Sequence, residues 1–300
     1  MQMTPHKKGT VPFRQWKTWY RITGSLDADR PPLIALHGGP GTTHDYLLAL
    51  TELAANGWPV IHYDQLGNGG STHLSGQPDN FWNIQLFLDE LENLLHKLGV
   101  AQDYVLFGQS WGGMLAAEHA TRRSPGLRGL AIANTPASMP LFREGVSRLR
   151  TTLPVEVQST LARHEEAGST DSQEYFNATM AFYERYVCRV NPLPKDVTAT
   201  LIELYNDPTV YHAMNGPSEF HVIGSLRDWT IVDRLPDVTV PTLLITGQYD
   251  EVVEAAARPF YDQIPDARWV VFNSSSHMPH VEEPEKFNQV MTDFLTDLIA

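Results

Sequence analysis

Cysteine, basic residues and long apolar runs are all scarce in this sequence of 300 residues. Its one cysteine, Cys188, cannot form a disulfide within the chain, so stability does not depend on an oxidising compartment. No stretch of about 18 apolar residues occurs that could form a transmembrane helix. Residues 1–13 carry positive charge but lack the apolar segment of a signal peptide. We therefore expect a cytoplasmic protein that does not enter a membrane.

Positive charge is in the minority, with 22 lysine and arginine residues against 35 aspartate and glutamate residues. The resulting net charge of −13 opposes contact with nucleic-acid phosphates or anionic lipid, so neither is expected as a partner. Hydrophobic residues make up 42% of the chain and charged residues 19%, which is enough apolar material for a sizeable core. The length allows one or two domains.

Short apolar runs alternate with helix-length segments in two parts of the chain. The runs that we expect to be buried strands are residues 33–36, 59–63, 104–107, 130–132, 242–246 and 268–272, and the alternating segment 14–23 fits an antiparallel strand or hairpin. Helical spacing of apolar residues occurs in 45–55, 84–98, 114–121, 256–263 and 284–299. This alternation predicts an α/β fold with a mostly parallel sheet and helices on both faces.

The alternation stops between residues 136 and 235. Apolar residues there recur at helical spacing, aromatic residues are frequent, and runs of β-branched residues are missing. We predict a helical cap, residues 136–235, inserted into a core formed by residues 1–135 and 236–300. Because ligands bind beyond the carboxyl ends of strands in open α/β sheets, the residues that follow each strand are the candidates for function.

Residues 108–112 read Gly-Gln-Ser-Trp-Gly, a G-x-S-x-G motif between a predicted strand and a predicted helix. The glycines allow a sharp turn that exposes the hydroxyl of Ser110. From average residue frequencies, about 0.07 such matches are expected by chance in a chain of this length. Because a serine hydroxyl becomes nucleophilic when a neighbouring base removes its proton, Ser110 is the candidate nucleophile.

Asp250 and His277 are the candidate partners of Ser110. In proteins with this type of turn the order along the chain is serine, acid, histidine, and Asp250 and His277 each follow a predicted strand. Glu251 remains a second candidate for the acid, whereas three other aspartates precede a strand: Asp228, Asp233 and Asp237. His280 has a spacing from His277 that could suggest a metal pair. No further cluster of ligands accompanies it, so we expect no metal ion.

The negative charge that develops on the substrate oxygen needs hydrogen-bond donors aimed at it. One candidate is the backbone N–H of Trp111, which follows the nucleophile. The other is the N–H of Gly39, in the segment His-Gly-Gly-Pro-Gly at residues 37–41, where glycines let the backbone approach a substrate. A tight turn without this role remains the alternative for that segment.

Three segments together resemble the proline iminopeptidases of the α/β-hydrolase fold. They are residues 37–41, residues 64–71 (Asp-Gln-Leu-Gly-Asn-Gly-Gly-Ser) and residues 108–113, and the resemblance spans nearly the whole chain. Residues 214–220 and 247–252 are similar to segments of the tricorn-interacting aminopeptidase and of bacterial L-amino acid amidases within that family. The resemblance implies a serine hydrolase that releases an unblocked N-terminal amino acid, often proline, from a peptide, amide or arylamide.

The same resemblance implies that Glu219 and Glu251 bind the free ammonium of the substrate. Physical chemistry agrees, because a buried ammonium needs charge-assisted hydrogen bonds, each contributing about 1.5 to 3 kcal/mol. Many proline iminopeptidases have arginine where this chain has Leu66 and Gly70, so a preference for proline over other small or apolar residues stays open. We expect Asp64 to brace loops.

The predicted function is therefore a serine aminopeptidase that needs no metal or other cofactor. Its expected partner is a small peptide or amino acid amide with a free N-terminal amine. Two alternatives use the same motifs. One is an esterase, lactonase or general amidase that ignores the ammonium, and the other is a receptor that keeps the fold without turnover. The sequence does not indicate an oligomeric state.

Overall fold

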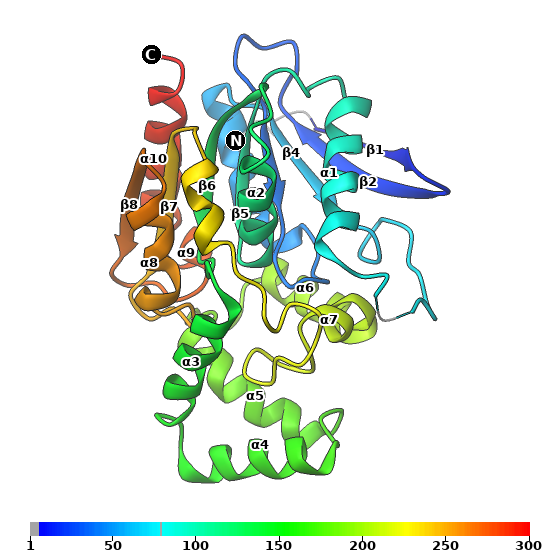
Figure 1. Ribbon diagram of the computed structural model, residues 1–300, viewed down its shortest axis with the longest axis vertical. Coiled ribbons are helices and arrows are strands. Elements are labelled where there is room, and N and C mark those ends of the chain that lie inside the picture. Colours follow the sequence, from blue (N-terminus) through cyan, green and yellow to red (C-terminus); the bar gives the residue numbers. More distant parts are fainter. Residues whose placement is uncertain (1–5, 79) are drawn as a thin grey trace.

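The computed structural model describes residues 6–78 and 80–300 of the chain (Figure 1). Of the segment 1–13 that was read for a signal peptide, residues 1–5 lie outside the described residues. Among the helices in the described ranges, none has both the length and the apolar character needed to span a membrane.

A sheet of eight strands passes through the described chain, in the order β1-β2-β4-β3-β5-β6-β7-β8. Two strands, β1 (His6–Phe13) and β2 (Trp16–Thr23), form a hairpin, and β2 also pairs antiparallel with β4 (Val60–Asp64). All other pairs are parallel, and the remaining strands are β3 (Leu33–Leu36), β5 (Tyr104–Gln109), β6 (Leu127–Ala133), β7 (Thr242–Gly247) and β8 (Ala267–Phe272). The predicted mostly parallel sheet is confirmed.

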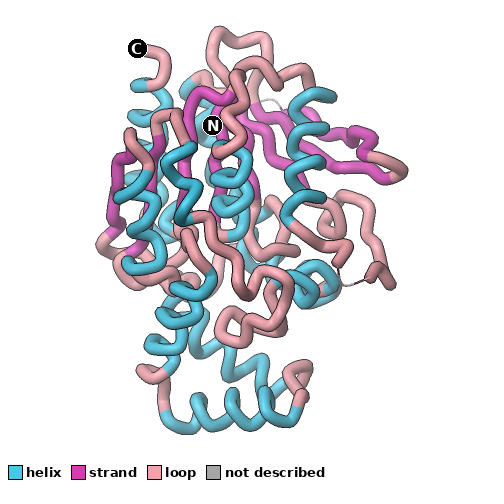
Figure 2. Tube along the Cα trace, in the orientation of Figure 1, coloured by secondary structure: helices cyan, strands magenta, loops and turns pink. Residues whose placement is uncertain are grey.

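Helices cover both faces of the sheet (Figures 1 and 2). On one face lie α1 (Ile84–Lys97), α2 (Trp111–Ala120) and α8 (Glu254–Gln263). The opposite face is covered by the 3-10 helix η1 (Asp45–Asn56) and by α10 (Pro284–Asp297), which contact each other. Because both faces are covered, β3 and β5 are buried along their whole length, and this explains their continuous apolar runs in the sequence.

Several predicted boundaries differ from the structure at the start of the chain. The segment 14–23 was predicted as an antiparallel strand or hairpin. Residues 16–23 form β2, Arg14 lies in the hairpin turn with a φ of 53°, and the other strand of the hairpin, β1, precedes the predicted segment. Most of β1 is exposed, and buried and exposed positions alternate only over its last four residues, which is too short a pattern to identify the strand. Helix α2 begins at Trp111 and not at residue 114, because the first helical turn contains two glycines without an apolar side chain.

Five helices lie between β6 and β7 in the sequence. They are α3 (Met139–Arg150), α4 (Val155–Ala167), α5 (Gln173–Tyr186), α6 (Lys195–Asn206) and α7 (Thr209–Met214), followed by the 3-10 helix η2 (Val232–Asp237). Figure 1 shows α3, α4 and α5 extending away from one end of the sheet, and α6 packs against η1. The division of the chain into core and cap at residues 136 and 235 stays a prediction.

An ion pair joins the loop after β4 to the end of α6. The Nδ1 atom of His73 lies 2.6 Å from Oδ2 of Asp207, and its Nε2 atom lies 3.0 Å from the carbonyl oxygen of Gly69. Burial lowers the pKa of His73, but the hydrogen bonds to Asp207 and Gly69 and the charges of Asp207 and Glu203 outweigh it, so the pKa is raised above its ordinary value. The protonated ring satisfies both acceptors.

We expect this ion pair to make stability depend on pH. A histidine whose pKa is raised on folding stabilises the fold below its unfolded pKa of about 6.5, and the effect is lost as the pH rises through the folded pKa. The variant His73→Ala should lower the free energy of unfolding by about 0.5 kcal/mol at pH 6, and by less at pH 9, as measured by urea unfolding. Asp207→Asn should reproduce this trend. A loss that does not change with pH would contradict the assignment.

Candidate active site

The turn between β5 and α2 holds Ser110 in a backbone conformation with a positive φ. Its φ is 55°, which is rare for a residue other than glycine and is typical of functional turns. Both glycines of the motif are required by space. A Cβ atom on Gly108 would lie 2.2 Å from the carbonyl oxygen of Gly112, and one on Gly112 would lie 2.1 Å from that of Leu36. The sequence motif therefore forms the sharp strand-to-helix turn that was predicted.

His277 and Asp250 form a buried hydrogen-bonded pair. The Nδ1 atom of His277 lies 2.7 Å from Oδ1 of Asp250. The same oxygen accepts a hydrogen bond of 2.9 Å from the N–H of Val252, and Oδ2 accepts one of 2.6 Å from the side-chain amide of Asn134. Because the ionised carboxylate only accepts, Nδ1 of His277 carries the hydrogen, which leaves Nε2 able to take up a proton.

Ser110 and His277 line the same pocket. Gly39, Glu219 and Glu251 line it as well. In the described part of the chain no hydrogen bond joins the Ser110 hydroxyl to His277, and such contacts often tighten only when substrate is bound. Residues that are far apart in the sequence therefore line one pocket.

A chain of hydrogen bonds connects the loop after β3 to His277. The N–H of Gly38 donates to the hydroxyl of Tyr46 over 2.7 Å, and this hydroxyl donates to Oε1 of Gln109 over 2.6 Å. The amide nitrogen of Gln109 then donates to the carbonyl oxygen of His277 over 3.0 Å. These contacts are buried, so the loop and the histidine are held in a fixed relation.

Two backbone N–H groups beside Ser110 are free to bind a substrate oxygen. The N–H groups of Gly39 and Trp111 donate no hydrogen bond within the described residues. Trp111 is the first residue of α2, where helical N–H groups have no partner in the helix. Gly39 has a φ of 106°, which only glycine adopts readily. Both groups could therefore stabilise an oxyanion.

Two carboxyl groups meet in the pocket. Glu219 accepts a hydrogen bond of 2.6 Å from the hydroxyl of Tyr211, while Glu251 is buried with Oε2 unpartnered and Oε1 3.6 Å from Nε2 of His277. Burial raises the pKa of Glu219, partly offset by the Tyr211 hydrogen bond. Burial, together with the charges of Glu219 and Asp250, raises the pKa of Glu251 well above its usual range. A cation bound between the two carboxylates would relieve this unfavourable arrangement.

The turn that follows α7 presents Glu219 to the pocket. The side-chain amide of Asn215 donates to the carbonyl oxygen of Ser218 over 3.2 Å, and the Ser218 hydroxyl lies 2.7 Å from that of Tyr175 in α5. Gly216 has a φ of 135°, which a residue with a side chain would not adopt readily. These contacts fix the backbone around Glu219.

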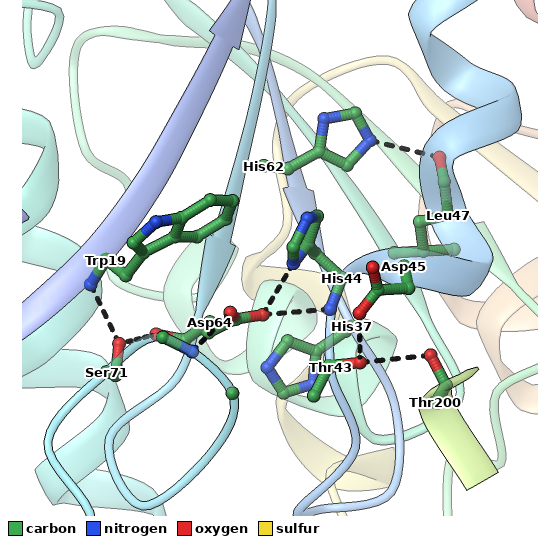
Figure 3. A network of polar contacts seen from close by, with 12 residues as sticks. Trp19, His37, Thr43, His44, Asp45, Leu47, His62, Asp64, Ser71 and Thr200 are labelled. Carbon is green, nitrogen blue, oxygen red and sulfur yellow. Dashed lines mark hydrogen bonds and ion pairs between the residues drawn. The ribbon is translucent and has the colours of Figure 1, made fainter. Parts of the chain in front are cut away.

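Asp64 joins the loop after β3 to the loop after β4 (Figure 3). Its Oδ1 atom accepts from the N–H of His44 at 2.9 Å and lies 2.8 Å from Nδ1 of the same residue, and Oδ2 accepts from the N–H of Gly70 at 2.9 Å. Burial favours a higher pKa for Asp64, but these hydrogen bonds outweigh it and the pKa is lowered. The prediction that Asp64 braces loops is confirmed.

His280 lies close to His277 but does not resemble a metal ligand. It is buried, both ring nitrogens lack hydrogen-bond partners, and burial lowers its pKa to about 3. Among the residues that the structure describes, no three histidine, cysteine, aspartate or glutamate side chains are grouped so that they could hold a metal ion.

Comparison with known proteins places this arrangement in a family. Residues 31–284 match the family described as alpha/beta hydrolase fold. The proline iminopeptidase of Lactobacillus delbrueckii subsp. lactis is 37% identical over 288 residues, which cover 95% of this chain and 96% of that protein. The chain belongs to the proline iminopeptidase family of α/β hydrolases. The resemblance stated from the sequence is confirmed.

Two solved structures are similar to this chain over almost its whole length. The crystal structure of a proline iminopeptidase from Mycobacterium smegmatis shares 48% identity and a TM-score of 0.90, covering 97% of this chain and 98% of its own. The crystal structure of VinJ shares 60% identity and a TM-score of 0.96, covering 97% of this chain and 99% of its own.

One departure from many proline iminopeptidases has a structural reason here. A Cβ atom on Gly70 would lie 2.7 Å from the ring of Trp19, so an arginine at this position would require that ring to move. Leu66, four residues earlier, is fully buried, and its N–H donates to Glu90 over 3.0 Å. This chain thus has no cationic side chain at either position.

Sequence reasoning missed two residues that hold the site. Asn134 follows β6 directly, so the rule that functional residues follow strands could have identified it. Tyr211, which hydrogen-bonds Glu219, lies within a short helix, where tyrosine most often packs into a core. No local signal distinguishes it.

Proposed function

We propose that this chain is a serine aminopeptidase that releases an unblocked N-terminal amino acid, with proline favoured, from short peptides, amino acid amides or arylamides. The observation that carries the proposal is the position of Glu219 and Glu251. Both carboxyl groups line the pocket that Ser110 and His277 line. The names of the relatives support the same activity.

The proposed reaction begins at Ser110. His277, oriented by Asp250, removes the proton of the hydroxyl, and the serine oxygen attacks the carbonyl carbon of the first residue. The N–H groups of Gly39 and Trp111 stabilise the negative oxygen of the tetrahedral intermediate. His277 then protonates the leaving amine, and water releases the amino acid from the acyl-enzyme by the same steps. The steps use groups of this chain and water, so the proposal requires no cofactor.

Glu219 and Glu251 act on the substrate's ammonium group in this proposal. Two carboxylates close together in a buried pocket repel each other, and a bound ammonium supplies the missing positive charge. A substrate with an acylated amine would leave both carboxylates without this partner, at a cost of at least about 1 to 3 kcal/mol. The pair therefore restricts the reaction to a free chain end.

A comparison of two substrates tests the proposal. Prolyl arylamide should be hydrolysed faster, in kcat/KM, than its N-acetyl form, by a factor of at least about 5 to 150. Equal rates on both would support an esterase, lactonase or general amidase in place of an aminopeptidase. A fluorophosphonate, which reacts with activated serines, should label Ser110. Absence of this adduct in mass spectrometry would support a receptor without turnover.

Acidification should weaken substrate binding. The ammonium binds the ionised carboxylates, and the pKa of Glu251 is raised. As the pH falls through that raised pKa, the pair takes up a proton, so KM for prolyl arylamide should rise. A series of KM measurements between pH 5 and pH 8 tests this, and Glu251→Gln should flatten the profile. A KM that falls on acidification would contradict the proposed role.

We further propose that residues 136–235 act as a cap over the pocket, since Tyr211 and Glu219 within this range contribute to it. The cytoplasm is the location that we propose for the reaction. The unpaired thiol of Cys188, which is buried, is compatible with a reducing compartment.

A further inference from the structure

We infer that Gln65 is a positioning residue that holds both donors of the oxyanion hole in place, an inference that rests on the proposed function. Gln65 directly follows β4 and is completely buried. It contacts His37, two residues before Gly39, and it contacts Trp111 itself. Nothing in the proposed chemistry uses Gln65, so its contacts call for another role.

The amide of Gln65 is fixed by what its partners can offer. Its Oε1 atom accepts from the indole N–H of Trp111 over 2.8 Å, and its side-chain nitrogen donates to the carbonyl oxygen of His37 over 3.0 Å. An indole N–H can only donate and a carbonyl oxygen can only accept, so the reverse orientation would lose both hydrogen bonds. Glutamate or leucine at this position could not make the same two contacts.

The backbone N–H of Gln65 determines the state of His37. It donates to Nε2 of His37 over 3.0 Å, so Nε2 is unprotonated and the ring hydrogen is on Nδ1. Burial lowers the pKa of His37 to about 4, which keeps the ring neutral near pH 7. The Nδ1 hydrogen faces the carbonyl oxygen of Gly38, 3.0 Å away.

That contact orients the first oxyanion donor. The carbonyl oxygen of Gly38 also accepts from the hydroxyl of Thr42 over 2.8 Å, so two donors hold it. The carbonyl of Gly38 and the N–H of Gly39 belong to one planar trans peptide, in which they point in opposite directions. Fixing the oxygen therefore fixes the direction of the Gly39 N–H. The contacts run from Gln65 to His37 and from His37 to Gly38.

The second donor is held by the indole contact. Trp111 is the first residue of α2, so restraining its ring restrains the backbone whose N–H would bind the oxyanion. The sheet order explains the reach of Gln65. Because β4, β3 and β5 are neighbours, a side chain that leaves the end of β4 crosses the end of β3 and meets the residue after the nucleophile.

Two variants remove these contacts. Gln65→Leu removes both side-chain hydrogen bonds, and Trp111→Phe removes only the indole N–H while keeping an aromatic ring. Trp229→Phe is the matched control, because the Trp229 indole donates over 2.8 Å to Glu118, also in α2 but away from the pocket. Thermal unfolding of each variant reports on folding, and Trp111→Phe serves if Gln65→Leu does not fold.

We expect Gln65→Leu and Trp111→Phe to lower kcat on prolyl arylamide by about 10-fold to 100-fold, with KM changed by less than about 3-fold. The double variant should have a kcat close to that of the slower single variant, because both single variants remove the same hydrogen bond between Trp111 and Gln65. Binding of a boronic acid analogue of proline, which forms a tetrahedral adduct at Ser110, should weaken by the same factor as kcat. Binding of proline itself should not change.

Three outcomes would overturn the inference. These are a kcat within 2-fold of the unmodified enzyme, an equal loss of affinity for the boronic acid and for proline, or the same kcat loss in Trp229→Phe. The rate of Ser110 labelling by a fluorophosphonate gives a readout that needs no aminopeptidase substrate. Slower labelling in Gln65→Leu supports the positioning role even if prolyl arylamide is not a substrate. Failure of the unmodified enzyme to hydrolyse prolyl arylamide would overturn the proposed function and not the positioning role.

Discussion

Replacement of Ser110 by alanine should lower kcat on prolyl arylamide by about a factor of 10⁵. Alanine has no hydroxyl, so no acyl-enzyme can form, while the N–H groups of Gly39 and Trp111 remain for residual rate enhancement. Alanine keeps the Cβ atom at this position, where φ is 55°, so the backbone strain does not change. The free energy of unfolding should therefore stay within about 0.5 kcal/mol of that of the unmodified chain.

A steady-state assay and urea unfolding measure these two quantities. Ser159→Ala is a suitable control, because Ser159 is an exposed serine of α4 that hydrogen-bonds only within its own helix. It should retain full activity. Turnover by Ser110→Ala at more than about one hundredth of the original rate would show that another group supplies the nucleophile.

Replacement of Glu219 by glutamine should reduce kcat/KM on free-amine substrates by about 10-fold to 150-fold, which corresponds to the loss of about 1.5 to 3 kcal/mol from one charge-assisted hydrogen bond. Glutamine is the same size, and its side-chain oxygen can still accept from the hydroxyl of Tyr211. The change therefore removes charge and little else. Glu251→Gln should act in the same direction on the same substrates.

The comparison that decides the ammonium role uses a blocked substrate. Slow hydrolysis of N-acetyl-prolyl arylamide should be unchanged or improved in Glu219→Gln, because that substrate brings no charge to pair with the carboxylate. Glu166→Gln, at an exposed position of α4, is the control for removing one negative charge from this helical region. An equal loss of kcat/KM on the free and the blocked substrate would show that Glu219 maintains the shape of the pocket and does not bind the ammonium.

The candidate nucleophile and its two candidate partners could be identified from the sequence because each depends on a local pattern. The G-x-S-x-G motif marks a strand-to-helix turn, and the strand before it is a continuous apolar run. Asp250 and His277 each follow such a strand, and parallel strands bring their carboxyl ends to one edge of the sheet. The hairpin strand β1 escaped prediction because its residues are mostly exposed.

The sequence by itself therefore determined the fold class and the family, and it predicted the reactive serine and the order of the residues proposed to assist it. Only the tertiary structure decided how those residues are held. Asn134 reaches Asp250 across 116 positions, and Gln65 reaches Trp111 across 46. A hydrogen bond forms only when donor and acceptor come within about 3 Å with the right orientation, and periodicity and motifs along one chain carry no such three-dimensional information.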